Sequence, residues 1–342
     1  MINIKREELL HQIEAVQPGL SPRDIVEQST CVIFQDGKIQ TYNDEIACSY
    51  KCALAQHMTG AARATSLISI LRKLTEEDLT VEINDGEIIF IGKKRKVGIN
   101  LEKEISLGMD VVEKPKKWIP LHEEFGEAVK LVHECAGKDA NKFAQMCVHV
   151  HPNWVEACDD FQMARYKLDT GVKASTIVRK TSIKHITDLG MTEFSETPAW
   201  MHFRNPSGLV FSCRRFLDEY KDITPHFKVQ GEKTTLPKGL VDATSRAEVF
   251  SSENKENNFV FVDLRPGKVR IRSEGATGWF SEIKNIQYHG SAISFYITPK
   301  LLIELTQRHN DCIINESRLK VKTGNFSYVA CLGKPEEPNE KD

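Results

Sequence analysis

A short alternating segment, residues 147–151, carries the side chains best suited to bind a metal. Its sequence is Cys-Val-His-Val-His, and a strand directs residues i, i+2 and i+4 to one face, so a thiol and two imidazoles would point the same way. With Cys158 or Asp160 as a fourth ligand, His149 and His151 could hold zinc in a metal-dependent enzyme. The paired C-x-x-C spacing of structural zinc sites is missing. We therefore favour a strand with one semi-polar face and expect no metal.

Two adjacent carboxylates, Asp159 and Asp160, with Asp169 nearby, are a second candidate for acid–base or metal chemistry. Adjacent residues in a strand or turn face apart, and aspartate is common in turns. The chain also lacks the glycine-rich loops that cradle nucleotide phosphates and any local signature of a nucleophile beside its base. We expect neither catalysis nor a cofactor.

Basic residues gather on three segments that also carry an apolar stripe at spacings of three and four, which indicates amphipathic helices. The stripes are Ala64, Leu67, Ile68, Leu71 and Leu74; Ile183, Ile186 and Leu189; and Leu301, Leu302 and Leu305. The cations are Arg63, Arg72 and Lys73; Arg179, Lys180 and Lys184; and Lys300 and Arg308. Because the formal net charge is only −2, the whole molecule is not basic, and a positive face on a weakly acidic body is predicted.

The three striped segments recur at intervals of about 115 residues, and each is flanked by the same elements. A predicted hairpin follows each helix, over residues 79–91, 200–211 and 312–322, and another precedes it, over 32–41, 148–157 and 259–271. Units this long can bury their own cores. The pattern predicts an α+β chain of three repeated domains, residues 1–115, 116–232 and 233–333, followed by a disordered acidic tail, residues 334–342.

The nine cysteines are scattered and mostly occupy apolar strands, as reduced core cysteines of a cytoplasmic protein do. No apolar run approaches the length that spans a bilayer, and no signal peptide is visible. We expect a cytoplasmic protein without a membrane partner.

Several strings, in order along nearly the whole chain, resemble the bacterial-type sliding clamp, the beta subunit of DNA polymerase III. The matching strings are residues 6–10 with the arginine-bearing loop at 21–23, the strand at 156–164, the segment 217–225, the helix at 245–250, the strand and helix at 288–305, and the closing strand at 328–332. Each string alone is weak, and their shared order is more specific.

The resemblance implies three DNA-clamp domains, each with two helices and antiparallel sheets, that form a ring as a homodimer. Val249 and Phe250 would plug the dimer interface. The ring would encircle double-stranded DNA without sequence preference, through phosphate contacts from the helix cations and Arg23. It would tether a DNA polymerase for processive synthesis.

The resemblance also places a groove for short peptides of the polymerase and the clamp loader. Carried over residue by residue, it comprises Cys158, Asp160, Phe161, Gln162, Met163, Asp218, Asp222, Ile223, Pro225, Val329, Cys331 and Leu332. The alternative is that these residues simply belong to domain cores.

The chain departs from the family pattern in this groove. Of the family's T-D-G-H-R string only Asp159 remains, Asp222 replaces a common cation, and the chain closes on a charged tail. A divergent clamp of a phage or mobile element is favoured. Two other readings stay open: a multi-domain scaffold that does not bind DNA, and the metal-dependent enzyme described above.

Overall fold

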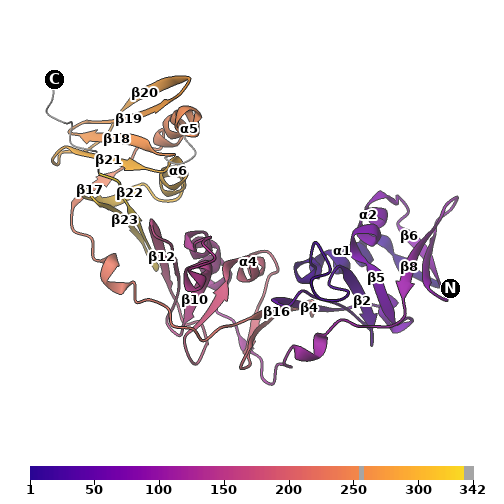
Figure 1. Cartoon of the computed structure of the whole chain (residues 1–342). Coiled ribbons are helices and arrows are strands. Elements are labelled where there is room, and N and C mark those ends of the chain that lie inside the picture. The colour runs from indigo at the N-terminus through magenta and orange to yellow at the C-terminus, as the bar shows by residue number, and fades with distance from the viewer. Residues whose placement is uncertain (254–257, 335–342) are drawn as a thin grey trace. The chain divides into compact units, whose positions relative to one another are not determined.

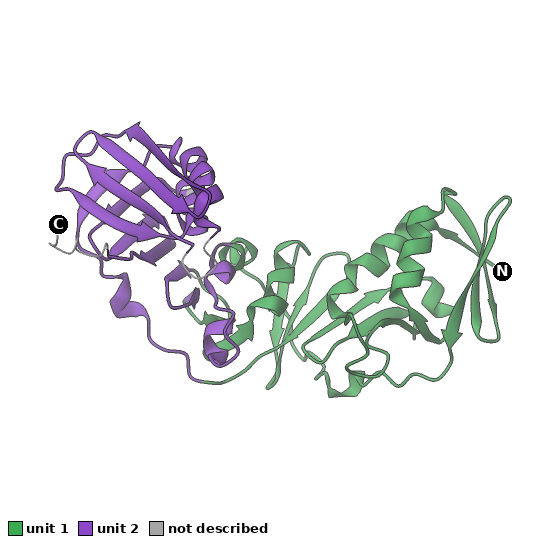
Figure 2. Cartoon of the chain, turned by 45° about the horizontal axis from the view of Figure 1, so that its top comes forward, with its two compact units in different colours: residues 1–130, 147–153, 168–218 green, residues 131–146, 154–167, 219–342 purple. Residues whose placement is uncertain are grey.

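The computed structural model describes residues 1–253 and 258–334, with Arg308 described by its backbone alone. The chain forms two compact units, coloured green and purple in Figure 2. Unit 1 comprises residues 1–130, 147–153 and 168–218, and unit 2 comprises residues 131–146, 154–167 and the chain from 219 onward. Apart from Lys334, the predicted acidic tail lies outside the described residues.

Unit 1 is built on an antiparallel sheet of twelve strands. In spatial order they are β1 (Ile2–Lys5), β6 (Asp78–Asn84), β7 (Glu87–Ile91), β8 (Lys96–Glu102), β5 (Gly60–Arg63), β2 (Cys31–Gln35), β3 (Lys38–Tyr42), β4 (Ile46–Lys51), β16 (Val210–Arg214), β15 (Trp200–Arg204), β14 (Glu193–Glu196) and β9 (Ile119–Pro120). Where β4 meets β16, Ser49 lies opposite Val210. The sheet therefore continues across the domain boundary predicted at residue 115. Unit 1 also contains the antiparallel pair β10 (Cys147–His151) and β13 (Thr176–Arg179).

The first and third predicted stripes form α-helices, α2 (Ala64–Lys73) and α6 (Pro299–Arg308), which Figure 1 labels. Helix α1 (Arg6–Ala15) contacts α2, and α3 (Phe125–Val132) follows β9. In α2 the apolar residues Ala64, Leu67, Ile68 and Leu71 are all buried, because spacings of three and four place them on one face. The other face of α2 is left to polar and basic residues.

The second stripe forms less helix than expected. Helix α4 (Lys180–Ile183) is a single turn, and residues Lys184–Thr187 continue it as a 3-10 turn. Ile183 and Ile186 are buried, whereas Leu189 lies beyond the helical residues. The β-branched residues in this run have lower helix propensity than the leucines of the other two stripes.

Unit 2 contains two antiparallel arrays of strands and two helices (Figure 1). One array has the order β11 (Trp154–Cys158), β12 (Gln162–Lys167), β24 (Phe326–Cys331), β23 (Arg318–Thr323), β22 (Asp311–Ile314) and β17 (Glu232–Thr235). The other is a four-stranded sheet of β20 (Gly278–Asn285), β19 (Lys268–Gly275), β18 (Val260–Arg265) and β21 (Ile293–Ile297). Helix α5 (Leu240–Ser251) packs on this sheet and on α6 (Pro299–Arg308).

The predicted hairpins form strands at the predicted places, and the α+β class is confirmed. Five of the six pairs lie within one unit: β2 with β3, β6 with β7, β15 with β16, β18 with β19, and β22 with β23. Several turns need left-handed backbone, which Gly86 supplies at φ 88° and Gly267 at φ 76°. All nine cysteines are free, and all but Cys331 are buried. Burial raises the pKa of the Cys48 and Cys147 thiols to about 12.

A buried histidine lies in the core of unit 1. His202 on β15 is 1% exposed, and its ring nitrogens lie 3.1 Å from Thr197 Oγ1 and 2.8 Å from Ser212 Oγ. Burial disfavours the imidazolium and lowers the pKa of His202 to about 4. The ring is therefore a neutral element of the core at physiological pH.

Candidate functional site

The strand Cys147–His151 lacks a set of metal ligands. His149 is 8% exposed, and its ring centroid lies 6.1 Å from that of His151. Within residues 1–253 and 258–334, no group of three histidine, cysteine or acidic side chains is arranged to hold a metal ion. Cys147, Val148, His149 and Val150 are all buried, so both faces of the strand serve packing.

The two adjacent aspartates make separate local contacts. Asp159 Oδ1 accepts hydrogen bonds from the backbone N–H of Phe161 and Gln162, both at 2.8 Å, and so shapes the turn between β11 and β12. Asp160 points elsewhere and pairs with Lys142 Nζ at 2.6 Å, which lowers the pKa of the Asp160 carboxyl. The two carboxylates do not form a shared acid–base pair.

The cations around α2 divide into paired and unpaired groups. Arg63 donates to Asp24 Oδ2 at 3.1 Å and to Thr30 Oγ1 at 2.6 Å. Arg72 lies 2.7 Å from Glu14 on α1. Lys73 is exposed and has no carboxylate within 4.0 Å among the described residues. Lys73 therefore presents an uncompensated charge, whereas the carboxylates beside both arginines weaken their field.

The same division holds around α4 and in the loop after α1. Arg179 Nε lies 2.7 Å from Glu45 Oε1, and Lys180 is half-buried at the start of α4. Lys184 and Arg23 are exposed, and the described part of the chain places no carboxylate within ion-pair distance of either. Among the predicted DNA contacts of unit 1, Lys73, Lys184 and Arg23 are thus the exposed cations that have no carboxylate within ion-pair distance in the described part of the chain.

Helix α6 in unit 2 carries the third cationic set. Lys300 lies 3.6 Å from Glu304 one turn later and 3.9 Å from Glu134. Both are long, exposed contacts that salt screens readily. The side chain of Arg308 lies outside the described atoms. Sequence spacing alone could not identify the acidic partners of these cations, because Glu14, Glu45 and Glu134 come from other elements.

Four residues of the predicted peptide groove meet in one buried cluster of unit 2. Cys158, Met163, Ile223 and Val329 pack together with Val229, and each is at most 9% exposed. Met163 lies opposite Val329 across the β12–β24 pair. The structure brings these four residues together, and they fill the space between their strands with one another.

The remaining groove residues surround this cluster in different ways. Leu332 is 7% exposed, whereas Phe161 is 56% exposed. Gln162 Oε1 accepts a hydrogen bond from the Tyr328 hydroxyl at 2.9 Å. Cys331 is exposed, and its backbone N–H donates to the Phe161 carbonyl at 2.7 Å. Within this set, Phe161 is the large apolar side chain that is exposed and accessible to a ligand.

Pro225 of the predicted groove lies in a single 3-10 turn, Thr224–Phe227. Asp222 Oδ1 accepts the Thr224 backbone N–H at 2.9 Å, and hydrogen bonds from the side chain and then the backbone of Thr224 lower the pKa of Asp222. The carboxylate therefore caps the turn, a local role that explains an acid where the resemblance expects a cation. Asp218 belongs to unit 1.

A buried ion pair anchors this turn, and sequence reasoning missed it. Arg165 on β12 lies 2.6 Å from Glu156 on β11, with side-chain exposures of 9% and 2%. The guanidinium also donates to Thr224 Oγ1 at 3.0 Å and stacks over the rings of Trp154 at 4.5 Å and Phe227 at 5.0 Å. It joins the β11–β12 hairpin to the 3-10 turn. The hairpin predicted at 148–157 ends at this glutamate, and the β11–β12 pairing that places Arg165 opposite Glu156 was not predicted.

The predicted dimer residues lie at the end of α5. Val249 is 61% exposed, while Phe250 is half-buried. Phe250 packs so closely against β20 that a Cβ on Gly278 would lie 2.9 Å from its ring. Strand β20, against which Phe250 packs, is an edge of the four-stranded sheet, and an edge strand presents unpaired backbone groups.

The helices and antiparallel sheets of this chain form the α+β architecture of sliding clamps, in which these elements are repeated. The sequence matches no protein-family model and no curated protein. Solved structures do match over nearly their whole length. A sliding clamp from Bartonella birtlesii bound to griselimycin has 11% identity and a TM-score of 0.85, covering 98% of this chain and 99% of its own.

DNA polymerase III beta subunits give similar agreement. That of Thermotoga maritima has 13% identity and a TM-score of 0.79, and a sliding clamp from Bacillus subtilis has 12% and 0.78; each match covers 98% of this chain and 99% of the other. At such identities the likeness establishes the fold. In the described part of the chain, no helix is long and apolar enough to cross a membrane.

Proposed function

We propose that this chain is a DNA sliding clamp, a processivity factor without a catalytic site of its own. The observation that carries the proposal is full-length structural agreement with sliding clamps, at a TM-score of 0.85 and 98% coverage. A partial match would support only a shared domain. Agreement over the whole chain supports a shared mode of assembly, in three domains over residues 1–115, 116–232 and 233–333.

The proposed DNA contacts come from the basic faces of α2, α4 and α6. Lys73, Lys184 and Arg23 would bind phosphates directly, because no carboxylate among residues 1–253 and 258–334 competes with them. Arg63, Arg72, Arg179 and Lys300 would first have to exchange a carboxylate for a phosphate. Such weak, screened contacts suit a protein that slides along DNA without reading its sequence.

Closure of the ring would require a homodimer. The free edge of β20 and the exposed Val249 of α5 form the proposed contact surface in domain 3. Pairing this edge with a strand of another copy would satisfy its backbone groups and cover the exposed valine. Retention on DNA then follows from topology, and individual contacts can remain feeble.

The partner surface is proposed around Phe161 in unit 2. Peptides of a polymerase and a clamp loader would contact this exposed ring and the polar rim of Asp160 and Gln162. The buried cluster of Met163 and Ile223 would support the rim or open to admit an anchor side chain. A phage origin would account for the altered rim, and a cytoplasmic location would follow from the binding of DNA.

Topological retention tests the proposal directly. The protein is incubated with nicked circular plasmid at low salt, and the DNA-bound fraction is isolated by gel filtration at about 150 mM salt, where exposed electrostatic contacts weaken. We expect co-elution with circular DNA and release when a restriction enzyme linearises the plasmid. Val249→Asp is the matched control, which is expected to fold but not to be retained. Equal retention on linear and circular DNA would contradict the proposal, and failure of the wild type to dimerise would favour a scaffold.

A further inference from the structure

The four-stranded sheet of unit 2 has two unlike faces. Helix α5 packs on one of them. On the other, Trp279 is 73% exposed, Ile283 48% and Tyr296 38%. These are three of the nine large apolar side chains that are exposed among the described residues. So much aromatic surface gathered on one sheet face indicates a binding surface.

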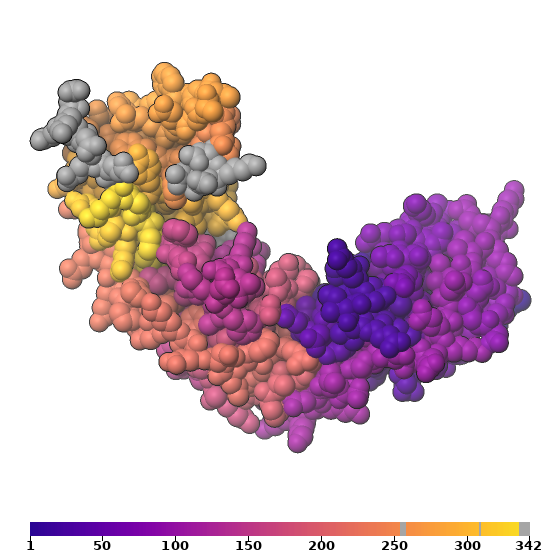
Figure 3. Space-filling model, viewed as in Figure 1, coloured from indigo at the N-terminus to yellow at the C-terminus, as the bar shows by residue number. Residues whose placement is uncertain are grey.

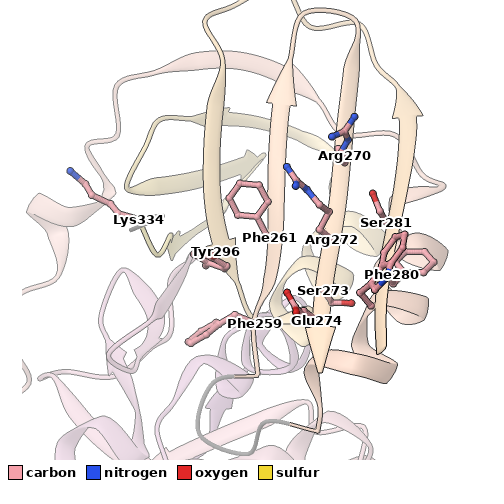
Figure 4. A pocket seen from close by; sticks show the side chains of 11 residues that line it. Phe259, Phe261, Arg270, Arg272, Ser273, Glu274, Phe280, Ser281, Tyr296 and Lys334 are labelled. Carbon is pink, nitrogen blue, oxygen red and sulfur yellow. The ribbon is translucent and has the colours of Figure 1, made fainter. Parts of the chain in front are cut away.

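Strand register arranges this face as an ordered row. Tyr296 on β21 lies opposite Phe261 on β18, which lies opposite Arg272 on β19, which lies opposite Ser281 on β20. Trp279 lies two residues before Ser281 on the same strand and so shares its face. Figure 4 shows the side chains of Phe261, Arg272 and Ser281 on neighbouring strands. An open hollow of about 900 Å³ lies over them.

Two arginines supply positive charge between the aromatic groups. Arg270 and Arg272 project from β19, and neither has a carboxylate within 4.0 Å in the part of the chain that the structure describes. Arg272 instead stacks on the Phe261 ring at 5.1 Å, and Phe261 meets Tyr296 edge-on at 5.3 Å. A guanidinium held by an aromatic ring rather than by an acid keeps its N–H groups available for an anion.

The arrangement favours one class of ligand. Trp279 and Tyr296 lie on the two outer strands, so three strand spacings, roughly 14 Å, separate them across the sheet. The unpaired arginines lie between them. Flat aromatic rings bind unstacked bases, and cations between the rings bind the linking phosphates. Glu274 lies opposite Trp279. Its negative charge would repel the phosphates of a nucleic acid and so direct the phosphate backbone toward the arginines.

We infer that this face, formed by Phe261, Arg270, Arg272, Trp279 and Tyr296, binds single-stranded nucleic acid. The surface is distinct from the basic helices proposed to contact duplex DNA. In Figure 3 the orange atoms of the β19–β20 hairpin lie at the surface of unit 2. The inference does not depend on ring formation, because a single chain contains the whole surface.

Fluorescence anisotropy with the full chain and a labelled oligothymidylate of about 12 nucleotides tests the inference. We expect binding at about 50 mM salt and an affinity about tenfold weaker in Trp279→Ala, the loss typical of one stacked base. In the double variant Arg270→Gln, Arg272→Gln, the slope of log affinity against log salt should fall by about 1.4, which corresponds to two phosphates on a single strand.

Two matched controls separate this face from general effects. Arg246→Gln removes an exposed arginine of α5 that is paired with Glu282 at 2.7 Å, and Phe161→Ala removes another exposed aromatic ring. Both should bind the oligonucleotide like the wild type. Because Trp279 is largely exposed, its variant should keep the wild-type unfolding midpoint. Unchanged affinity of Trp279→Ala, or undetectable binding by the wild type, would overturn the inference. Binding of polyglutamate with the same dependence on Trp279, and no binding of the oligonucleotide, would reassign the face to acidic protein partners.

Discussion

Substitution of Arg165 by methionine should destabilise unit 2 strongly. The change leaves Glu156, whose side chain is 2% exposed, without its ionic partner, and it breaks the 3.0 Å hydrogen bond to Thr224. Removing one member of a buried ion pair costs about 3–5 kcal/mol. With a urea m value of about 2 kcal/mol/M, the unfolding midpoint should fall by roughly 2 M. Urea titration followed by tryptophan fluorescence measures this shift, since Trp154 lies beside the guanidinium.

A matched pair in unit 1 provides the control. Arg204 lies 2.6 Å from Glu193 and 4.6 Å from the Trp118 ring, but the two charged side chains are 35% and 37% exposed. Arg204→Met should therefore cost at most about 1 kcal/mol. The double variant Glu156→Met, Arg165→Met should recover most of the loss, because an apolar pair of similar volume needs no ionic partner. Equal costs for both single arginine variants would refute the reasoning from burial.

Three further predictions concern DNA, pH and assembly. The double variant Lys73→Glu, Lys184→Glu should bind a short linear duplex more weakly than the wild type at low salt, since neither lysine has a competing carboxylate among the described residues, and an affinity equal to wild type would remove α2 and α4 from the DNA surface. The pKa of His202 is about 4 in the folded state, below the ordinary value of 6.5. The free energy of unfolding therefore contains the full contribution of this residue above pH 6.5, and about 3 kcal/mol of it is lost as the pH falls toward 4. Urea midpoints should decline over that range in wild type and decline less in His202→Gln; parallel curves would contradict this. Val249→Asp should give folded monomers of 38.8 kDa in analytical ultracentrifugation, whereas a dimer at micromolar concentration would place the interface elsewhere.

The sequence alone determines much of the secondary structure of this protein. The stripe Ala64, Leu67, Ile68 and Leu71 predicts α2 because the helical period puts all four residues on one side. Turn signals such as Asp36-Gly37 and Pro266-Gly267 predict hairpins because few residues accept their backbone angles. These are local properties, and the structure places strands and turns where they predict. Two segments predicted to form the peptide groove also lie side by side, because the strands that contain Met163 and Val329 pair with each other.

The tertiary structure decides which of the predicted residues are available to bind anything. Spacing marks Arg72 and Lys73 as equivalent cations, yet Glu14 of another helix pairs with the first alone. Met163 and Ile223 are predicted to line a groove, and packing buries both of them. The aromatic row from Trp279 to Tyr296 exists only through the register of four strands. Charge compensation, burial and cross-strand neighbours depend on contacts between distant segments, and a local pattern contains no information about those contacts.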